Sequence, residues 1–428
     1  MLKKTALINA TLLDGTKEMT PIAGMTVLFE GTKIISISHG SRVPEDCDII
    51  DLGGRFLLPG LINMHVHIMG SGAPMGKRIQ TPETIQKILK HSLSKNFIKR
   101  MCAKNAQTQL LSGVTTIRTV GGLADIDSTI RNSINSGKYL GPRMLVSDMA
   151  VTVPGGHMAG LVAYPAQSEE DCRILVRQIA ANKPDLIKLM VTGGVLDATA
   201  KGEPGVLRMP YTYVEACCDE AHKLGYPVAA HVESTEGVMV ALKAGVDTIE
   251  HSAVMNEEIL KLFIEKKASN ICTISPAIPL AELPSEMTKS TELTQYNGSV
   301  VFNGIVSAAK TALENGIPVG LGTDSACPFV TQYDMWRELY YFHKFVGVSN
   351  AFALHTATLC NAAILGLDKE TGSIEVGKSA DMLIVEKNPI ENLDALRQPY
   401  MVITRGKTIK NPKIKKNTRI ERALDGLM

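Results

Sequence analysis

The sequence predicts an α/β fold: a (β/α)8 barrel of the TIM type, together with a small β-sandwich domain built from both ends of the chain. Three observations support this prediction. Apolar strand-like runs alternate with helical patterns through the middle of the chain. Several of these runs carry a polar residue near their end, and short β-type runs separated by turns occupy both chain ends. At 428 residues, the chain is long enough to bury a large core.

Residues 1–57 are predicted to form the first part of the β-sandwich domain. Turns that contain glycine separate four short β-type runs, which are Thr5–Leu13, Met25–Phe29, Lys33–Ser38 and Ile49–Leu52. Such a small antiparallel unit is too thin to be stable alone. Residues 369–428 contain further strand-turn-strand patterns. We therefore expect the two chain ends to pair, with residues 58–368 inserted between them as the barrel.

Eight strands are predicted within this inserted segment. They are Leu58–His67, Val114–Val120, Arg143–Val151, Leu186–Thr192, Val228–Val232, Thr248–His251, Asn270–Ile274 and Val319–Thr323. Their nearly continuous apolar runs indicate burial on both faces, as in a parallel barrel. Helical patterns such as Tyr213–Leu224 and Val300–Asn315 lie between most of them. Two connections, residues 68–100 and 275–299, are unusually long, which is typical of lids or specificity loops.

Residues with metal-binding chemistry follow several predicted strands. His65 and His67 end the first strand, and residues i and i+2 of a strand point to the same side, so both imidazoles should face one point. Taken alone, this pair fits two hydrogen-bonded core histidines equally well. Later strands, however, carry further residues of this kind, which are Lys188, His231, His251 and Asp324. Several strands that each supply one polar side chain are typical of a metal site in a barrel.

Composition narrows the class of protein. The formal net charge is +2, which gives no reason to expect a nucleic-acid or membrane partner. No apolar run reaches the roughly 18 residues of a membrane-spanning helix, and the first residues read as a strand rather than a signal peptide. The eight cysteines lack a Cys-x-x-Cys spacing, which favours free thiols in a reducing cytoplasm.

In their order along the chain, these motifs resemble those of the amidohydrolase superfamily over essentially the full length. The matching segments are Pro59–His67, Gly113–Arg118, Lys188, Ala230–Glu233, Gly245–His251, Gly322–Asp324 and Gly372–Met382. Each segment is a weak signal alone, whereas the ordered set is specific. Within the superfamily, the chain is most similar to the imidazolonepropionase-related group, which includes metal-dependent prolidases and Xaa-Arg/Xaa-Lys dipeptidases. His157, which follows Gly155-Gly156 after the third strand, also fits this group.

The resemblance implies a site for two divalent ions. Imidazoles and carboxylates are suitable ligands for zinc, which is therefore the expected metal. By resemblance, His65, His67 and Asp324 would hold the more buried ion, and His231 and His251 the more exposed one.

Lys188 requires a separate argument, because a protonated amine cannot bind a cation. The resemblance implies that Lys188 is an N6-carboxylysine, whose two oxygens would bridge the ions. The alternative is a lysine paired with a nearby acid. Lys188 lies within an apolar run, Leu186–Val191, where a charged amine would be costly to bury.

These residues predict an enzyme that hydrolyses an amide or peptide C–N bond of a small substrate, such as a dipeptide or an N-acyl amino acid. Water that bridges two ions is deprotonated near neutral pH and becomes the nucleophile. His157 is expected to stabilise the developing oxyanion, unless it is a loop histidine bonded locally. Asp324 is expected to pass a proton to the leaving amine.

The main alternative is a mononuclear deaminase or a cyclic amidase of the imidazolonepropionase type. Similar enzymes of that kind lack the bridging lysine, and the deaminases carry His-x-x-Glu on the fifth strand, whereas Glu233 stands one residue too early here. A catalytically silent binding protein is a third class, which the complete ligand set disfavours.

The roles of two charged residues, Glu233 and Arg118, are not fixed by the sequence. Glu233 stands where related dipeptidases have a tyrosine near the substrate carboxylate, so it would favour a cationic or neutral substrate. Arg118 would either meet an anionic substrate group or form a structural ion pair. The expected partner is a small-molecule amide, and because relatives are often dimeric or larger, we expect a homo-oligomer.

Overall fold

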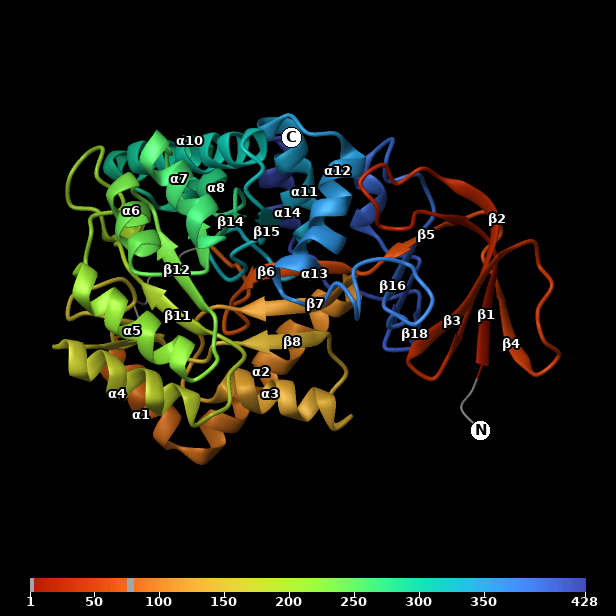
Figure 1. Ribbon diagram of the computed structural model, residues 1–428, viewed down its shortest axis with the longest axis horizontal. Coiled ribbons are helices and arrows are strands. Elements are labelled where there is room, and N and C mark those ends of the chain that lie inside the picture. The colour runs from red at the N-terminus through yellow and green to blue at the C-terminus, as the bar shows by residue number, and fades with distance from the viewer. Residues whose placement is uncertain (1–3, 75–80) are drawn as a thin grey trace. The chain divides into compact units, whose positions relative to one another are not determined.

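The computed structural model describes residues 4–74 and 81–428 (Figure 1). By its internal contacts, the chain divides into two compact units. The terminal unit comprises residues 1–63, 107–117 and 333–415. The site unit comprises residues 64–106, 118–332 and 416–428. Both units are built from segments that lie far apart in the sequence.

The terminal unit contains one mixed sheet of eight strands within the described residues, in the order β18-β17-β16-β5-β1-β2-β3, with β4 paired to β1. These strands are β1 (Lys4–Leu12), β2 (Ile22–Glu30), β3 (Lys33–His39), β4 (Cys47–Asp51), β5 (Phe56–Pro59), β16 (Met382–Val385), β17 (Met401–Thr404) and β18 (Lys407–Lys410). Antiparallel pairing of β16 with β5 joins the two chain ends, as predicted. Apolar side chains from six of these strands, including Leu7, Phe29 and Ile384, form the core of the unit.

The prediction of a purely antiparallel unit is wrong, because β1 pairs in parallel with both β4 and β5. Residues 4–8 of β1 pair with β4, and residues 11 and 12 pair with β5. Asn9, whose φ is 55°, lies between these two stretches. A left-handed residue redirects the strand, so that its two halves meet different neighbours.

Two further sheets carry the strands that lead to the predicted site residues. A seven-stranded sheet has the order β10-β9-β11-β12-β13-β14-β15, and every pair recorded within it is parallel. A three-stranded sheet has the order β6-β7-β8. Their bounds are β6 (Leu61–Val66), β7 (Val114–Thr119), β8 (Arg143–Val146), β9 (Ala150–Thr152), β10 (Ala163–Pro165), β11 (Ile187–Met190), β12 (Val228–Val232), β13 (Thr248–His251), β14 (Ser269–Cys272) and β15 (Val319–Leu321).

Two of the predicted strands are each divided in the structure. Leu58–His67 is split at Gly60, and its first half, β5, belongs to the sheet of the terminal unit. Arg143–Val151 is split into β8 and β9 around Asp148, whose φ of 55° is incompatible with extended strand geometry. The short strand β10 was not predicted.

Backbone hydrogen bonds continue the strand pairing beyond these sheets. The Asp324 N–H donates to the His65 carbonyl at 2.8 Å, and the His67 N–H donates to the Ser325 carbonyl at 3.1 Å. On the other side, the Asp185 N–H donates to the Val146 carbonyl at 2.7 Å. The end of β6 therefore lies beside the end of β15, which brings His65 and Asp324 together.

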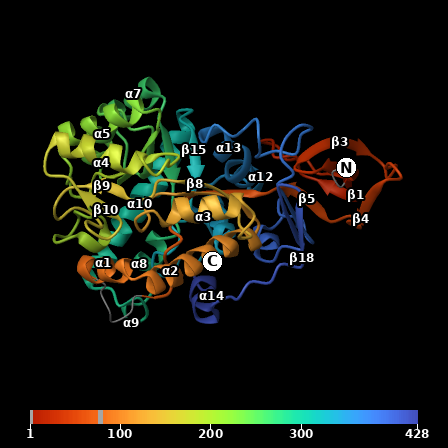
Figure 2. The ribbon, with the colours of Figure 1, turned by 90° about the horizontal axis from the view of Figure 1, so that it is seen from below.

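Helices separate most of the strands. Their bounds are α1 (Pro82–Lys90), α2 (Ser92–Leu111), α3 (Ile126–Asn135), α4 (Glu169–Ala180), α5 (Tyr211–Lys223), α6 (Thr235–Lys243), α7 (Glu257–Lys266), α8 (Ala277–Glu282), α9 (Ser285–Thr288), α10 (Glu292–Glu314), α11 (Met335–Tyr341), α12 (Asn350–His355), α13 (Asn361–Ile364) and α14 (Thr418–Asp425). In the site unit, α4 packs against β9 and β11, and α5 and α6 pack against β12. Figures 1 and 2 show these helices outside the strands.

The two long connections are largely helical. The first contains α1 and the start of α2, and residues 75–80 of it lie outside the described residues. The second contains α8 and α9, and α10 begins at Glu292, eight residues before the predicted helix at Val300. Among the described residues, no helix is long and apolar enough to cross a membrane.

Candidate metal centre

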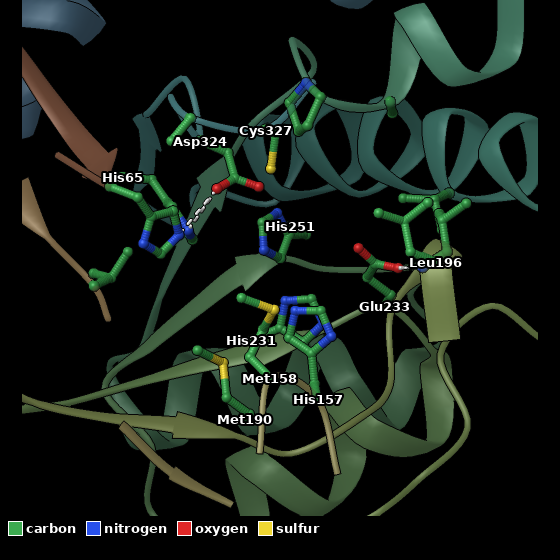
Figure 3. Close-up of a pocket in the computed structure, with 18 of the residues that line it drawn as sticks. His65, His157, Met158, Met190, Leu196, His231, Glu233, His251, Asp324 and Cys327 are labelled. Atoms are coloured by element: carbon green, nitrogen blue, oxygen red, sulfur yellow. Dashed lines mark hydrogen bonds and ion pairs between the residues drawn. The ribbon is translucent and has the colours of Figure 1, made fainter. Parts of the chain in front are cut away.

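A cavity of about 250 Å³ in the site unit contains the predicted site residues (Figure 3). Its polar lining residues are His65, His67, His157, Lys188, His231, Glu233, His251 and Asp324. The rest of the lining is mostly aliphatic, with three methionines among it. A mostly apolar cavity with a few convergent polar groups is typical of a site for a small ligand.

Strand ends bring these residues together. His65 lies at the end of β6, His251 ends β13, and Asp324 follows β15. His251 and Asp324 have φ values of 69° and 54°, in the left-handed region that side chains other than glycine rarely adopt. Strained backbone of this kind is concentrated at functional sites, where the surrounding structure holds it in place.

Two groups of side chains have ligand atoms that lie within 4.8 Å of one another. The first group is His65, His251 and Asp324, and the second is His231, Glu233 and His251. His67 adjoins the first group, since its Nε2 lies 3.1 Å from Asp324 Oδ1. The structure thus brings together all the predicted histidine ligands and Asp324, and it adds Glu233, which the sequence analysis did not place as a ligand.

The imidazoles of these groups have the protonation state that metal binding needs. Burial lowers the pKa of His65 to about 4. Burial, together with neighbouring positive groups, also lowers the pKa values of His231 and His251 well below the ordinary value. Neutral imidazoles have a free lone pair, so this set of donors fits divalent ions.

A buried ion pair holds His65 from behind. His65 Nδ1 lies 2.8 Å from Glu250 Oε2, and Arg118 Nη2 donates to Glu250 Oε1 at 2.6 Å. Although burial alone would raise the pKa of Glu250, the Arg118 guanidinium and the His65 hydrogen bond hold it well below its usual range. The ionised Glu250 accepts a hydrogen bond from the Nδ1–H group of His65, so the lone pair that a metal would use is on Nε2, which faces Asp324.

This arrangement decides between the two roles considered for Arg118. Arg118 is not among the cavity-lining residues and also donates to the Met64 carbonyl at 2.7 Å. Arg118 is therefore a structural ion-pair partner. Sequence reasoning missed Glu250, for which the available signal was a charged residue inside an apolar strand run.

Lys188 lies in the cavity with its amine buried. Its side chain is 1% exposed, and Nζ has no hydrogen-bond partner among the described residues. Burial lowers the pKa of Lys188 to about 8, against the opposing effect of Glu250. The salt bridge considered as the alternative is not found among the described residues. A buried amine without an acceptor is costly, so the site as it stands fits an additional group at this nitrogen.

His157 lies at the cavity wall and is oriented by two contacts. Its ring stacks on His231, with centroids 4.3 Å apart and an interplanar angle of 4°. Its Nδ1 bonds to Asp197 Oδ2, an oxygen that also accepts from the Gly194 N–H at 3.0 Å. The remaining ring nitrogen, Nε2, is therefore the one available to a ligand. Sequence reasoning missed Asp197, because it lies 40 residues from His157 in a short 3-10 turn, Val195–Asp197.

Two other acidic or nucleophilic groups line the cavity. Glu233 Oε2 accepts from the Val195 N–H at 3.0 Å, and burial, together with the Asp324 charge, raises the pKa of Glu233 to about 8. Burial and the Asp324 charge also raise the pKa of the Cys327 thiol well above its ordinary value. Cys327 is therefore not a thiolate nucleophile.

Residues 56–410 match the amidohydrolase family. The chain belongs to this family. The match covers every strand of the three-stranded and seven-stranded sheets and all the residues of the two ligand groups. The protein is therefore a hydrolase that acts on C–N bonds.

Two solved structures resemble this amidohydrolase closely. The crystal structure of a proposed prolidase from Bifidobacterium longum has a TM-score of 0.88 and 36% identity, and the alignment covers 100% of this chain and 99% of that chain. A Xaa-Pro dipeptidase with methionine bound in its active site has a TM-score of 0.84 and 28% identity, covering 95% of this chain and 100% of the other.

Curated relatives are more distant. The ochratoxinase of Aspergillus niger is 25% identical over 388 residues, which cover 84% of this chain and 76% of that protein. A 5-methylthioadenosine/S-adenosylhomocysteine deaminase of Bacillus cytotoxicus is also 25% identical, covering 90% of this chain and 85% of the deaminase. The relatives thus include a proposed prolidase, a Xaa-Pro dipeptidase, an ochratoxinase and a deaminase.

Proposed function

We propose that this amidohydrolase binds two divalent ions of the zinc type and hydrolyses the amide bond of a small substrate such as a dipeptide. The main support for the proposal is the buried Lys188 amine, which has no partner among the described residues and lies in the same cavity as five histidines and Asp324. A site for a single ion would not require a lysine at position 188. The likeness to a Xaa-Pro dipeptidase supports a dipeptide or a similar amide.

The proposed ligands follow from the two groups of side chains. Lys188, carboxylated at Nζ, would contribute to holding both ions, and the added group would account for a buried nitrogen that has no acceptor among the described residues. His65, His67 and Asp324 would hold one ion, and His231 and His251 the other. When bound, the ions would supply a nucleophile derived from water and would polarise the substrate carbonyl.

The chain's own residues would perform the remaining steps. Asp324 would take up a proton and deliver it to the leaving amine. His157, fixed by Asp197, would direct Nε2 to the carbonyl oxygen and stabilise its developing negative charge. The aliphatic wall of the cavity would exclude water from these groups.

The proposal includes the finer architecture predicted from the sequence. We take the two parallel sheets as one closed (β/α)8 barrel over residues 58–368, and the terminal sheet as a β-sandwich formed by residues 1–57 and 369–428. The hydrogen bonds between the ends of β6 and β15 support closure. A cytoplasmic location, a homo-oligomeric state and the absence of nucleic-acid or membrane partners stay predictions.

A product screen by mass spectrometry tests the function. Zinc-loaded, bicarbonate-treated protein is incubated with dipeptides, N-acyl amino acids, cyclic amides and aminated heterocycles. We expect products in which an amide has been split after gain of water. Products that have exchanged an amino group for oxygen would instead indicate a deaminase, like the Bacillus relative, and would refute the role given to Lys188.

A further inference from the structure

We propose that Glu233 is the residue that selects substrates with a free ammonium group on the carbon next to the scissile carbonyl. The substrates would then be unblocked aminoacyl amides, such as dipeptides, in preference to N-acyl amino acids. This inference rests on the proposed function, and it goes further by naming the group that the enzyme requires on the acyl side.

Glu233 lies close to the place proposed for the substrate carbonyl. Ligand atoms of His231, Glu233 and His251 lie within 4.8 Å of one another. His231 and His251 are the proposed ligands of the more exposed ion, beside which the substrate carbonyl would lie. In an aminoacyl group, one carbon atom separates the ammonium nitrogen from the carbonyl carbon. A carboxylate this close to the carbonyl site is therefore within reach of that ammonium group.

Among the described residues, Glu233 has no positively charged partner. Its Oε2 accepts from the Val195 N–H, and Glu233 forms no ion pair within the described part of the chain. Lys188 is the only lysine or arginine among the described residues that line the cavity, and it has its own proposed role. An ionised, partly buried Glu233 favours a charged partner in this cavity, and a substrate ammonium would supply one.

The same lining disfavours an anionic group at this place. Among the described lining residues there is no arginine or tyrosine to bind a carboxylate.

The apolar wall indicates the side chain that accompanies the ammonium group. Figure 3 shows Glu233 beside Leu196, with Met158 and Met190 among the other labelled side chains. Leu280 and Ile305 also line the cavity. An unbranched or branched aliphatic side chain, such as that of leucine or methionine, would bury its surface there.

Binding is the first test, because it does not depend on turnover. Leucinamide and 4-methylpentanamide differ only in the amino group, and titration calorimetry compares their affinities. We expect the wild type to bind leucinamide about 10–100-fold more tightly, the range for a hydrogen bond to a charged group. Glu233→Gln should remove this difference. Glu236→Gln, which changes an exposed acid outside the catalytic cavity, should retain it.

Turnover is the second test and separates the two proposals. We compare kcat/KM for leucyl-alanine, N-acetyl-leucyl-alanine and 4-methylpentanoyl-alanine in the same three proteins. In the wild type, kcat/KM should be about 10–100-fold higher for leucyl-alanine than for the other two substrates. Glu233→Gln should lower kcat/KM for leucyl-alanine only. Equal rates for all three substrates would overturn the ammonium site while leaving amide hydrolysis intact. Preferential leucinamide binding without any hydrolysis would overturn the proposed function instead.

Measuring the metal content tests the remaining explanation, which is that Glu233 is a metal ligand. Glu233→Gln is expected to retain the same number of ions as the wild type and the same thermal unfolding temperature. Loss of one ion equivalent would make Glu233 a metal ligand and would overturn its role as the ammonium site.

Discussion

Glu250→Gln tests whether the buried pair behind His65 supports both the fold and the metal centre. Glu250 is 0% exposed and accepts three bonds, from His65 Nδ1, Arg118 Nη2 and the Thr248 hydroxyl at 2.7 Å. Glutamine has nearly the same volume but only one acceptor oxygen. Its amide NH2 would face either the His65 Nδ1 proton or the Arg118 guanidinium, so one donor would lose its acceptor.

Glu250→Gln should lower both the free energy of unfolding and the metal affinity. Removing one partner of a buried ion pair costs about 3–5 kcal/mol. Arg118 keeps its bonds to the Met64 carbonyl and, at 3.1 Å, to Thr248 Oγ1. We therefore expect the lower end, about 3 kcal/mol, or roughly a 100-fold change in the unfolding equilibrium. Loss of the acceptor that orients a metal-binding histidine should also weaken metal affinity by about 10–100-fold.

Urea denaturation of the metal-free protein measures the first effect, and competition with a chelator measures the second. Glu220→Gln is a matched control, because Glu220 is also buried but pairs at 3.1 Å with Arg177, whose side chain is 45% exposed. The control should cost less than about 1 kcal/mol and leave metal affinity unchanged. Equal losses for both variants, or a Glu250→Gln variant with wild-type metal affinity, would refute the reasoning.

Four further outcomes are expected. Asp324→Asn should lose about 10²–10⁴-fold in kcat while metal analysis still finds bound ions, whereas near-normal turnover would remove Asp324 from the proton-transfer role. Intact-mass spectrometry of gently handled protein should find the mass of one added CO2. Lys188→Met should abolish this added mass and lower the content of bound metal. A wild-type protein without the added mass would contradict the carboxylation of Lys188. Asp197→Asn should lower kcat more than it changes KM, because it frees the His157 ring, and a change in KM alone would speak against that orientation. Burial raises the pKa of Asp127 to about 7, above about 3.9 when unfolded, so folded-state stability should fall as pH rises from about 4 to about 7. Between pH 5 and pH 7.5 the fall should be about 2.5 kcal/mol in urea denaturation, and Asp127→Asn should remove it; parallel curves for both proteins would contradict this.

Much of the candidate site was predictable because the ligands are tied to strand ends. A residue at the end of a buried strand has a position that the strand sets, and His65, His67, His231 and His251 each follow a recognisable apolar run. The residues that support them were not predictable. A hydrogen bond such as that of His65 with Glu250 joins positions 185 residues apart, and no local pattern encodes it.

The same difference applies to the fold. Alternating strand and helix patterns indicated an α/β fold and the pairing of the two chain ends, since periodicity and turn residues are local properties. Backbone conformation at single residues was not visible in those patterns. Asn9 and Asp148, both with φ of 55°, divide or redirect strands that the sequence presents as continuous.

The sequence by itself determined the family, the α/β class and the identity of the residues that can bind metal, because these depend on residue types and their spacing. Only the tertiary structure decided what surrounds them. It paired Arg118 with Glu250 rather than with a substrate, and set Glu233 beside His231 and His251. It also left the Lys188 amine without a partner among the residues that the structure describes. Burial and charge at a site are sums over side chains from many strands and loops, so they exist only once the chain has folded.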